Sequence, residues 1–290
     1  MKICTHDREF HTDDVLSLAL LTELYPDAEV VRSRDPEVWA ASDIVVDVGG
    51  VYEPERGRYD HHQLDPAVDR ENGIRRSGFG LVWEHYGRRF CPDAAVWSKI
   101  DSKLAMPVDA GDNGQSVYDL NQYGVSPFQL EDVIKSFYPL AANSEETYDG
   151  QFKVAVELGR TLLKRLVGQE TAKVEAGSKL VALYEAATDK RYVVATDYLP
   201  SKDVKDQLPE LLYVVFPVND GATWRVMAVD GDAPFSSRRR FPLDWGGLEG
   251  AALATKTGVA DAVFCHRGGF IAVAGSREGA EKLVKLSLGE

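Results

Sequence analysis

The amino-acid sequence predicts an α/β protein with an N-terminal parallel-sheet domain and a smaller C-terminal α/β domain. Strand-like and helical patterns alternate within residues 2–50, helical patterns without strand candidates fill residues 130–176, and short β-rich runs return in the last third. We therefore expect a first domain over residues 1–125, a helical connector over 126–177 and a second domain over 178–290.

The order of elements at the start of the chain predicts a β-α-β unit. Residues 2–5 (KICT) form a short apolar run, and residues 10–25 then change to helical spacing, with acids at the expected start of the helix. Residues 28–34 and 42–50 are further strand candidates. The second of them is apolar almost throughout, which is typical of a parallel strand covered on both faces.

The rest of the chain supplies more helices and a second sheet. Amphipathic helices are expected over residues 77–87 and 93–105, and the Gly- and Asp-rich stretch 106–115 is expected to form a turn. In the last third the pattern predicts strands over residues 178–186, 191–199, 211–218, 223–230, 261–266 and 269–275. Helices over residues 248–256 and 276–288 complete this domain.

Charge and cysteine content restrict the partners and the compartment. The chain carries 46 acidic and 33 basic side chains, a net charge of -13, which repels nucleic acid and anionic membranes unless positive charge is supplied locally. Its three cysteines exclude a disulfide scaffold. Because it has no signal-peptide pattern and no run of 18 apolar residues, we expect a cytoplasmic protein without a membrane partner.

The histidines indicate where the chemistry lies. Four of the six occur beside aspartates in two short segments, residues 6–14 and 58–63. Further aspartates follow the third expected strand, in residues 47–50, and recur in residues 108–114. Because each segment lies at a strand end or in a loop, all four can converge at the sheet edge where α/β proteins bind ligands.

This combination of imidazoles and carboxylates is a ligand set for Mn²⁺, Mg²⁺, Fe²⁺ or Zn²⁺, and the absence of cysteine disfavours a structural zinc site. The ligands exceed what one ion needs. Two ions roughly 3.5 to 4 Å apart, bridged by one carboxylate, would use them all and would suit hydrolysis of a phosphate ester. In the alternative interpretation, acids such as Asp13 and Asp14 only cap a helix, but no cap requires the consecutive Asp60, His61 and His62.

At these residues the sequence resembles the Myg family of the DHH phosphoesterase superfamily, which is named for the Asp-His-His triplet. The resemblance extends almost end to end, over THDREFHTDD, DIVVDVGGVYEPERGRYDHHQ, RSGFGLVWEHYG, VDAGDNG, FPLDWGGL and FCHRGGFIAVAGSREGA. It implies a first domain that holds two divalent ions, usually Mn²⁺ with Mg²⁺ as an alternative, and a second domain that closes over the substrate. It also implies 3'-5' exonuclease action on RNA or short oligonucleotides.

The resemblance assigns roles residue by residue. The implied metal ligands that follow the family motifs directly are His6, His11, Asp13 and His61. Asp47 is implied as the carboxylate that bridges the ions, Asp60 as the partner that fixes the tautomer of His61, and His62 as a proton donor or charge stabiliser facing the phosphate. Asp112 is the expected fourth-segment ligand, because its Asp-Asn-Gly sequence resembles the Asp-Thr-Gly turn of related phosphoesterases. Asp109 is its rival.

Two positions depart from the family pattern, which has Gly where Arg8 stands and Glu where Asp14 stands, and neither is an expected ligand. Arg8 has two interpretations: it reaches a substrate phosphate in the catalytic site, or it occupies the positive-φ position of the missing glycine. The expected substrate-binding residues are Ser77, His266, Arg267, Gly268, Gly269 and Arg240. Their plainer alternatives are a helix cap at Ser77, a hairpin turn for the two glycines and an exposed basic loop for Arg240.

Two other functions stay open. A small-molecule phosphoesterase acting on a nucleotide or pyrophosphate is favoured by the negative charge, and a metal-binding regulatory protein without turnover would use the same ligands. A homodimer is also compatible with the sequence. No cofactor other than metal is expected, since the chain has neither a dinucleotide-binding Gly-x-Gly-x-x-Gly after a strand nor a Walker A motif.

Overall fold

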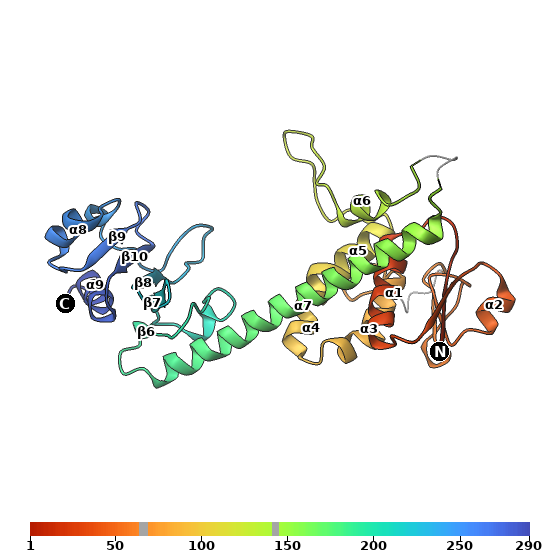
Figure 1. Cartoon of the computed structure of the whole chain (residues 1–290), viewed down its shortest axis with the longest axis horizontal. Coiled ribbons are helices and arrows are strands. Elements are labelled where there is room, and N and C mark those ends of the chain that lie inside the picture. The colour runs from red at the N-terminus through yellow and green to blue at the C-terminus, as the bar shows by residue number, and fades with distance from the viewer. Residues whose placement is uncertain (64–68, 141–144) are drawn as a thin grey trace. The chain divides into compact units, whose positions relative to one another are not determined.

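The computed structural model describes residues 1–63, 69–140 and 145–290, and each of two compact units carries its own five-stranded sheet (Figure 1). The first unit is Met1–Thr171 and the second is Ala172–Glu290. The boundary between them falls inside the longest helix of the described chain, α7 (Tyr148–Ala186).

The first unit contains the predicted β-α-β arrangement. Its sheet has the order β2-β1-β3-β5-β4, from β1 (Lys2–Thr5), β2 (Glu29–Arg32), β3 (Ile44–Val46), β4 (Tyr52–Glu53) and β5 (Arg58–Tyr59). All neighbouring pairs are parallel except β4 with β5. The carboxyl ends of β1, β3 and β5 therefore lie at one edge of the sheet.

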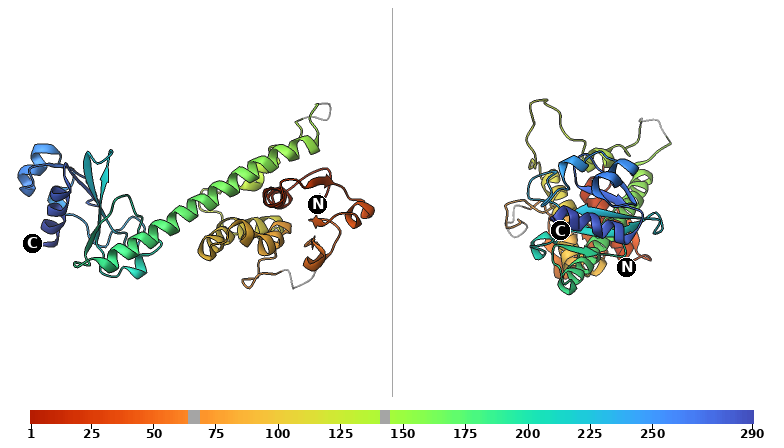
Figure 2. Two further views of the ribbon diagram at one scale, coloured as in Figure 1. Left: turned by 60° about the horizontal axis from the view of Figure 1, so that its bottom comes forward. Right: turned by 90° about the vertical axis from the view of Figure 1, so that its left-hand side faces the viewer.

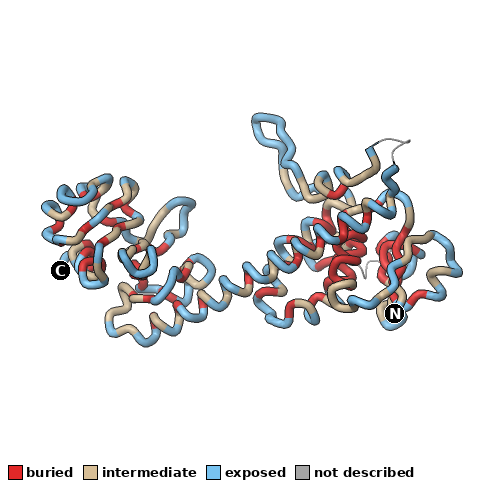
Figure 3. The backbone as a smooth tube through the Cα atoms, viewed as in Figure 1, coloured by how far each residue is buried: buried red, intermediate tan, exposed pale blue. Residues whose placement is uncertain are grey.

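Helices enclose this sheet. They are α1 (Thr12–Leu24), α2 (Pro36–Ala40), α3 (Gly78–Phe90), α4 (Ala94–Ile100), α5 (Met106–Asp112) and α6 (Leu130–Lys135), with a π-helical stretch, η3 (Asp101–Ala105), and a 3-10 turn, η1 (Pro54–Arg56). Helix α1 is buried along most of its length (Figure 3). It packs against α3 and against α7, where Gly159 lies close to Ala19.

The second unit is a mixed sheet of order β6-β7-β8-β10-β9, in which only β6 and β7 are parallel. Its elements are β6 (Tyr192–Val194), β7 (Tyr213–Val218), β8 (Thr223–Ala228), β9 (Ala262–Cys265), β10 (Ile271–Ala274), α8 (Gly250–Thr257), α9 (Arg277–Leu288) and the 3-10 turns η4 (Lys205–Gln207) and η5 (Leu243–Trp245). Side chains alternate along β7 between two cores: Tyr213 and Val215 belong to the cluster containing α9, and Val214 and Phe216 belong to the cluster containing the end of α7. Figure 2 shows the ribbon of this sheet with α9 and the end of α7 beside it.

The predicted fold class is confirmed, but two local predictions are wrong. Residues 178–186, expected to be a strand, continue α7, because Leu180 and Tyr184 lie one helical turn apart and are both buried on one face. The stretch from residue 106, expected to be a turn, begins with α5, in whose first turn Pro107 is tolerated.

Among the described residues, no helix combines the length and the apolar composition needed to cross a bilayer.

Candidate metal centre

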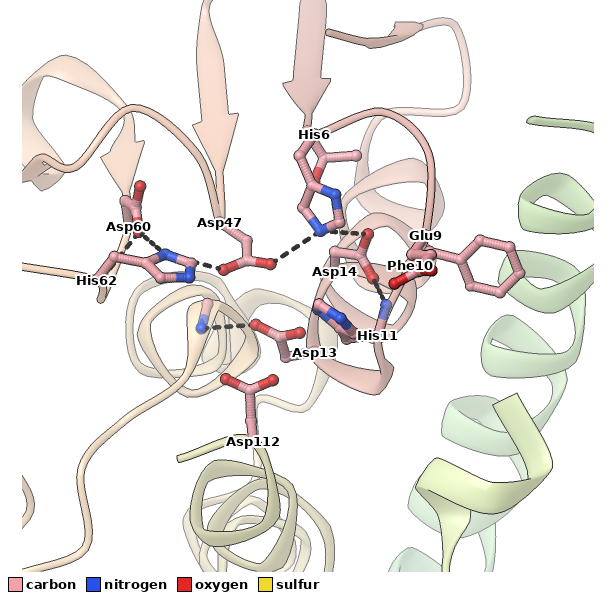
Figure 4. Close-up of polar contacts among 12 residues, drawn as sticks. His6, Glu9, Phe10, His11, Asp13, Asp14, Asp47, Asp60, His62 and Asp112 are labelled. Atoms are coloured by element: carbon pink, nitrogen blue, oxygen red, sulfur yellow. Dashed lines mark hydrogen bonds and ion pairs between the residues drawn. The ribbon is translucent and has the colours of Figure 1, made fainter. Parts of the chain in front are cut away.

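The ends of three parallel strands bring the predicted ligands together (Figure 4). His6 directly follows β1, Asp47 directly follows β3, and the Asp60-His61-His62 triplet directly follows β5. Helix α1 contributes His11, its N-cap, and Asp13, while α5 contributes its last residue, Asp112. Segments far apart in the sequence thus meet at one sheet edge.

Asp47 occupies a special backbone conformation, with φ of 55°. This left-handed region costs a non-glycine residue about 1 to 3 kcal/mol, although Asp tolerates it better than most, and such residues cluster at functional sites. Gly49 (φ 100°) and Gly50 (φ 67°) continue the turn. The sharp reversal after β3 places the Asp47 carboxylate among the histidines.

The two oxygens of Asp47 face different histidines. Its Oδ2 lies 3.2 Å from His6 Nε2, and its Oδ1 lies 3.2 Å from His61 Nε2. His6 Nε2 is also 3.3 Å from Asp14 Oδ2, and His61 Nε2 is also 3.2 Å from Asp112 Oδ2. One carboxylate between two imidazoles, each with a second carboxylate, is the arrangement of a bridging ligand.

The residues fit divalent ions on three grounds. First, the buried oxygens Asp13 Oδ1, Asp14 Oδ2 and Asp47 Oδ1 accept no hydrogen bond from any described residue, which is costly unless another partner is supplied. Second, the imidazole-carboxylate separations of 3.2 to 3.3 Å lack hydrogen-bond geometry at these atoms. These separations match the distance of about 3.0 to 3.4 Å between two ligand atoms that each lie about 2.1 Å from the same ion.

Third, the donor atoms form three overlapping groups, each within 4.8 Å. These groups are His6 with His11 and Asp47, Asp47 with His61 and His62, and His11 with Asp13 and Asp112. Asp47 belongs to two of them, and so does His11. The overlap favours more than one ion, with Asp47 shared.

Burial dominates the electrostatics of these carboxyl groups. It raises the pKa of Asp13 well above the usual range, with added repulsion from Asp47 and Asp112. Burial likewise raises the pKa of Asp14 to about 7 and that of Asp112 to about 6. For Asp47, burial is outweighed by the contacts with His6 and His61, and its pKa is lowered. A bound cation would relieve the repulsion among these four carboxyl groups.

The prediction that Asp60 fixes the tautomer of His61 is wrong, because Asp60 contacts His62 and not His61. Its Oδ1 accepts from the backbone N–H of His62 at 3.0 Å and lies 2.6 Å from His62 Nδ1, while its Oδ2 accepts from the Gly50 N–H at 2.5 Å. The hydrogen bond with Asp60 raises the pKa of His62 to about 9. The His62 side chain is 64% exposed. Asp60 thus holds a protonated, solvent-accessible imidazole beside the cluster.

Asp109 and Asp112, the two candidates for the fourth-segment metal ligand, have different contacts in the structure. Asp109 is fully buried, and its Oδ2 accepts from Arg70 Nε at 2.6 Å. Its Oδ1 accepts from the backbone N–H of Ser77 at 3.0 Å and from Ser77 Oγ at 2.7 Å. All of its contacts are therefore structural, whereas Asp112, three residues later on α5, faces His61.

Ser77 is also fully buried, so the predicted substrate contact is wrong. Its hydroxyl accepts from the Gly80 N–H as the N-cap of α3 and donates to Asp109. The neighbouring Gly78 serves the metal centre, because its N–H donates to Asp13 Oδ2 at 3.0 Å. A Cβ there would lie 3.0 Å from that oxygen and 3.1 Å from the Cβ of Asp47.

Two charged residues of the site were not predicted. Asp14 is fully buried; it accepts from the His11 N–H at 2.8 Å, as a helix cap does, and also faces His6. Arg75 lines a cavity of about 280 Å³ together with His11, Asp47, His61, His62, Asp112 and Asn113. The only sequence signals were a second acid at the start of α1 and a basic residue just before α3.

The backbone at Arg8 supports the second interpretation, in which Arg8 occupies the positive-φ position of the family glycine. It has φ of 68°, the conformation for which the family glycine is suited, and its side chain is exposed. Its carbonyl accepts from Arg32 Nη2 at 2.7 Å.

In the second unit, the predicted substrate motif forms the hairpin turn between β9 and β10. His266 Nδ1 accepts from the Gly268 N–H at 2.9 Å, and the Gly269 N–H donates to the His266 carbonyl. Gly269 itself has a positive φ of 67°. Gly269 packs beside Arg240, and the Arg240 and Arg267 side chains are both exposed. The glycines therefore have a turn role, and the two arginines stay available to a ligand.

Comparisons with known proteins agree with the motifs. A family model named for MYG1 exonuclease, described as uncharacterised protein family UPF0160, matches residues 2–288. The chain is 31% identical to MYG1 protein YER156C of Saccharomyces cerevisiae over 99% of this chain and 95% of that protein. It is also 31% identical to MYG1 exonuclease of Homo sapiens over 100% of this chain and 86% of that protein.

Among solved structures, RecJ from Thermus thermophilus in complex with Mn²⁺ is similar at 13% identity with a TM-score of 0.30, covering 100% of this chain and 52% of RecJ. The match of the family model over nearly the whole chain, with two relatives above 30% identity, shows the family. The chain belongs to the MYG1 family, UPF0160.

Proposed function

We propose that this protein is a divalent-metal-dependent phosphodiesterase that removes nucleotides from the 3' end of RNA or short oligonucleotides. The chain is a phosphoester hydrolase, the class to which its relatives named exonuclease belong. The observation that carries the proposal is the Asp47 carboxylate, whose two oxygens face His6 and His61 within overlapping ligand groups.

The ligand groups around Asp47 would hold two divalent ions, with Mn²⁺ as our choice, and the ions would supply charge neutralisation and an activated water for attack on phosphorus. His62 lies at the exposed side of the cluster, and Asp60 keeps its imidazole protonated. It is placed to donate a proton to the leaving oxygen or to stabilise charge on the phosphate.

Arg75 supplies the guanidinium beside the ligands. Its Nε donates to Asp69 Oδ1 at 3.1 Å and its Nη1 to the Gln63 carbonyl at 3.3 Å. Among the residues that the structure describes, Nη2 has no such partner, so it can donate to a phosphate oxygen. The side chain is only 22% exposed, so it is held at the cavity wall. A positioned arginine favours bidentate or charge-assisted contact with a phosphate.

The size and charge of the site support a short substrate. A cavity of about 280 Å³ lies at the lower end of small-ligand sites, so it suits a single nucleotide end better than a duplex. The net charge of -13 opposes binding of a long polyanion. We propose the 3' polarity and the preference for RNA from the family resemblance.

The test is hydrolysis of RNA and DNA oligomers labelled at the 3' or the 5' end, from dinucleotides to about 20 nucleotides, a range that brackets single-strand binding sites. Each oligomer is incubated with Mn²⁺, with Mg²⁺ and with chelator. We expect metal-dependent ladders that shorten from the 3' end. Ladders from the 5' end would refute the polarity, and no cleavage of any oligomer by metal-loaded protein would refute the nuclease proposal.

The same cavity and charge favour a second candidate, a phosphoesterase acting on a mononucleotide or pyrophosphate. This candidate predicts that kcat/KM does not rise with oligomer length and that it exceeds the oligomer value on the small substrate. A kcat/KM that increases from dinucleotide to longer oligomers would exclude it.

A further inference from the structure

The segment between α5 and α6 exposes an unusual share of apolar side chains. Within residues 114–128, which we name the apolar loop, five large apolar residues are exposed: Val117 by 53%, Leu120 by 58%, Tyr123 by 75%, Val125 by 69% and Phe128 by 78%. The loop extends away from α6 in Figure 1 and is coloured as exposed over most of its length in Figure 3. Gathered exposed apolar residues mark an interaction site.

The first end of the loop is fixed at the metal centre. Asn113, just before it, lines the 280 Å³ cavity, and its Nδ2 donates to the Arg75 carbonyl at 3.1 Å. Gln115 Oε1 accepts from the Arg75 N–H at 2.9 Å, and Gln115 Nε2 donates to the Gly73 carbonyl at 3.0 Å. These contacts tie the loop to the residue that we place against the substrate phosphate.

The second end returns to the same place. Gln129 and Leu130 line a cavity of about 130 Å³ whose other walls include His11 and Asp112 from the metal centre. Gln129 also begins α6 through a reciprocal cap with Asp132. Both ends of the apolar loop are therefore anchored beside the reacting groups.

The chemistry of the loop selects its partner. Asp119 is its only charged residue, so the loop has no cation with which to bind phosphates or an anionic membrane. It does carry three aromatic residues, Tyr118, Tyr123 and Phe128. Flat aromatic side chains next to a phosphodiesterase site match the faces of unpaired nucleobases, which stack on such side chains whatever the base.

We propose that the apolar loop is a base-stacking site, in which Tyr123 and Phe128 bind unpaired bases of the strand whose end lies in the metal centre. The inference rests on the proposed function for the identity of the strand. Stacking supplies affinity that the acidic surface cannot supply through phosphates. Binding therefore requires single-stranded, unpaired bases.

The experiment measures binding of a fluorescent eight-nucleotide single strand by anisotropy, with Ca²⁺ in place of Mn²⁺, and repeats it with an abasic strand of the same length. Tyr123→Ala and Phe128→Ala are compared with Phe235→Ala, a matched control because Phe235 is fully exposed in the second unit. Melting temperatures verify folding, and these exposed positions should change little.

We expect each loop variant to weaken binding by about 5- to 150-fold, because one base-aromatic stack contributes about 1 to 3 kcal/mol. The abasic strand should bind weakly to every protein, and the Phe235→Ala protein should match the wild type. Loop variants that bind like the wild type, an abasic strand that binds as tightly as the normal one, or a wild type that binds no strand would each overturn the proposal.

Hydrolysis with Mn²⁺ separates this inference from the proposed function. If the wild type binds strands in a base-dependent way and cleaves none, the stacking site stands and the phosphodiesterase fails. If normal and abasic strands are cleaved with equal kcat/KM, the phosphodiesterase stands and the stacking site fails.

Discussion

Asp47 and Asp109 are both buried aspartates of the first unit, yet the same change to Asn should affect them in opposite ways. Asp47 lies among carboxyl groups and imidazoles that accept or donate few good hydrogen bonds. Asp109 receives hydrogen bonds from Arg70 and from Ser77. The pair therefore distinguishes a metal ligand from a structural ion pair.

Asp47→Asn should remove turnover without unfolding the protein. Asn tolerates the left-handed backbone at this position. The change loses the attraction of the carboxylate for His6 and His61, and the relief of its repulsion with Asp13 offsets that loss. We expect the unfolding free energy of the metal-free protein to change by less than about 1 kcal/mol. Metal-dependent kcat should fall by at least about 10²- to 10³-fold, the loss of about 3 to 4 kcal/mol of transition-state stabilisation.

Asp109→Asn should destabilise the protein and spare the chemistry. Loss of one partner from a buried ion pair costs about 3 to 5 kcal/mol, and the remaining Arg70 contact with Asp101 places the cost at the lower end, about 3 kcal/mol. For a unit of this size we expect a melting temperature lower by about 6 to 12 °C. Below that temperature kcat should stay within about tenfold of the wild type.

Urea unfolding of both metal-free variants and manganese-dependent cleavage of a dinucleotide provide the assays. The reasoning is refuted if Asp47→Asn keeps full turnover. It is equally refuted if Asp109→Asn abolishes turnover while the protein keeps wild-type stability, since Asp109 would then be the ligand.

Three further predictions follow from the site. In metal-free protein, burial raises the pKa of Asp14 to about 7 and that of Asp112 to about 6, so the folded state keeps protons that the unfolded state has released. The free energy of unfolding of the metal-free protein, measured by urea titration, should therefore fall as pH rises from about 4 to 7. Added Mn²⁺ should restore that free energy at pH 7. A metal-free stability that rises across this pH range would contradict the burial argument. Arg75→Ala should raise KM for oligonucleotides by about tenfold, with Arg75→Lys intermediate, because a charge-assisted hydrogen bond contributes about 1.5 to 3 kcal/mol; an unchanged KM in steady-state kinetics would remove Arg75 from the substrate site. Arg8→Gly should raise the unfolding free energy by about 0.5 to 1 kcal/mol, since relief of the left-handed backbone exceeds the entropy cost of glycine, and should leave kcat unchanged; a loss of turnover would return Arg8 to the catalytic site.

The sheet edge could be predicted from the sequence because parallel strands end on the same side. An apolar run followed directly by an ionisable residue, as at Asp47, therefore indicates both the strand and the site. The same logic led to His6, because the apolar pattern marks the ends of these two strands clearly. The triplet Asp60-His61-His62 was recognised instead as consecutive ligand-type residues, since β5 has only two residues and lies in a polar segment that did not predict a strand.

The partners within the site could not be predicted, because they depend on backbone turns and helix phase. One Asp60 oxygen accepts from the Gly50 N–H, in the turn after β3, and the other contacts His62. The choice between Asp109 and Asp112 depends on α5 being a helix. Asp109 contacts Ser77, the N-cap of α3, whereas Asp112, three residues later, contacts His61, which follows β5. The helical end of α7 was missed because a run such as LVALY suits a strand as well as a buried helix face.

The most direct test of the central claim is anomalous diffraction at the manganese edge from crystals soaked in Mn²⁺. We predict two peaks about 3.5 to 4 Å apart on either side of the Asp47 carboxylate, with His6 and His61 on different ions. The absence of any peak at Asp47, or a single peak held only by exposed acids elsewhere, would contradict the account.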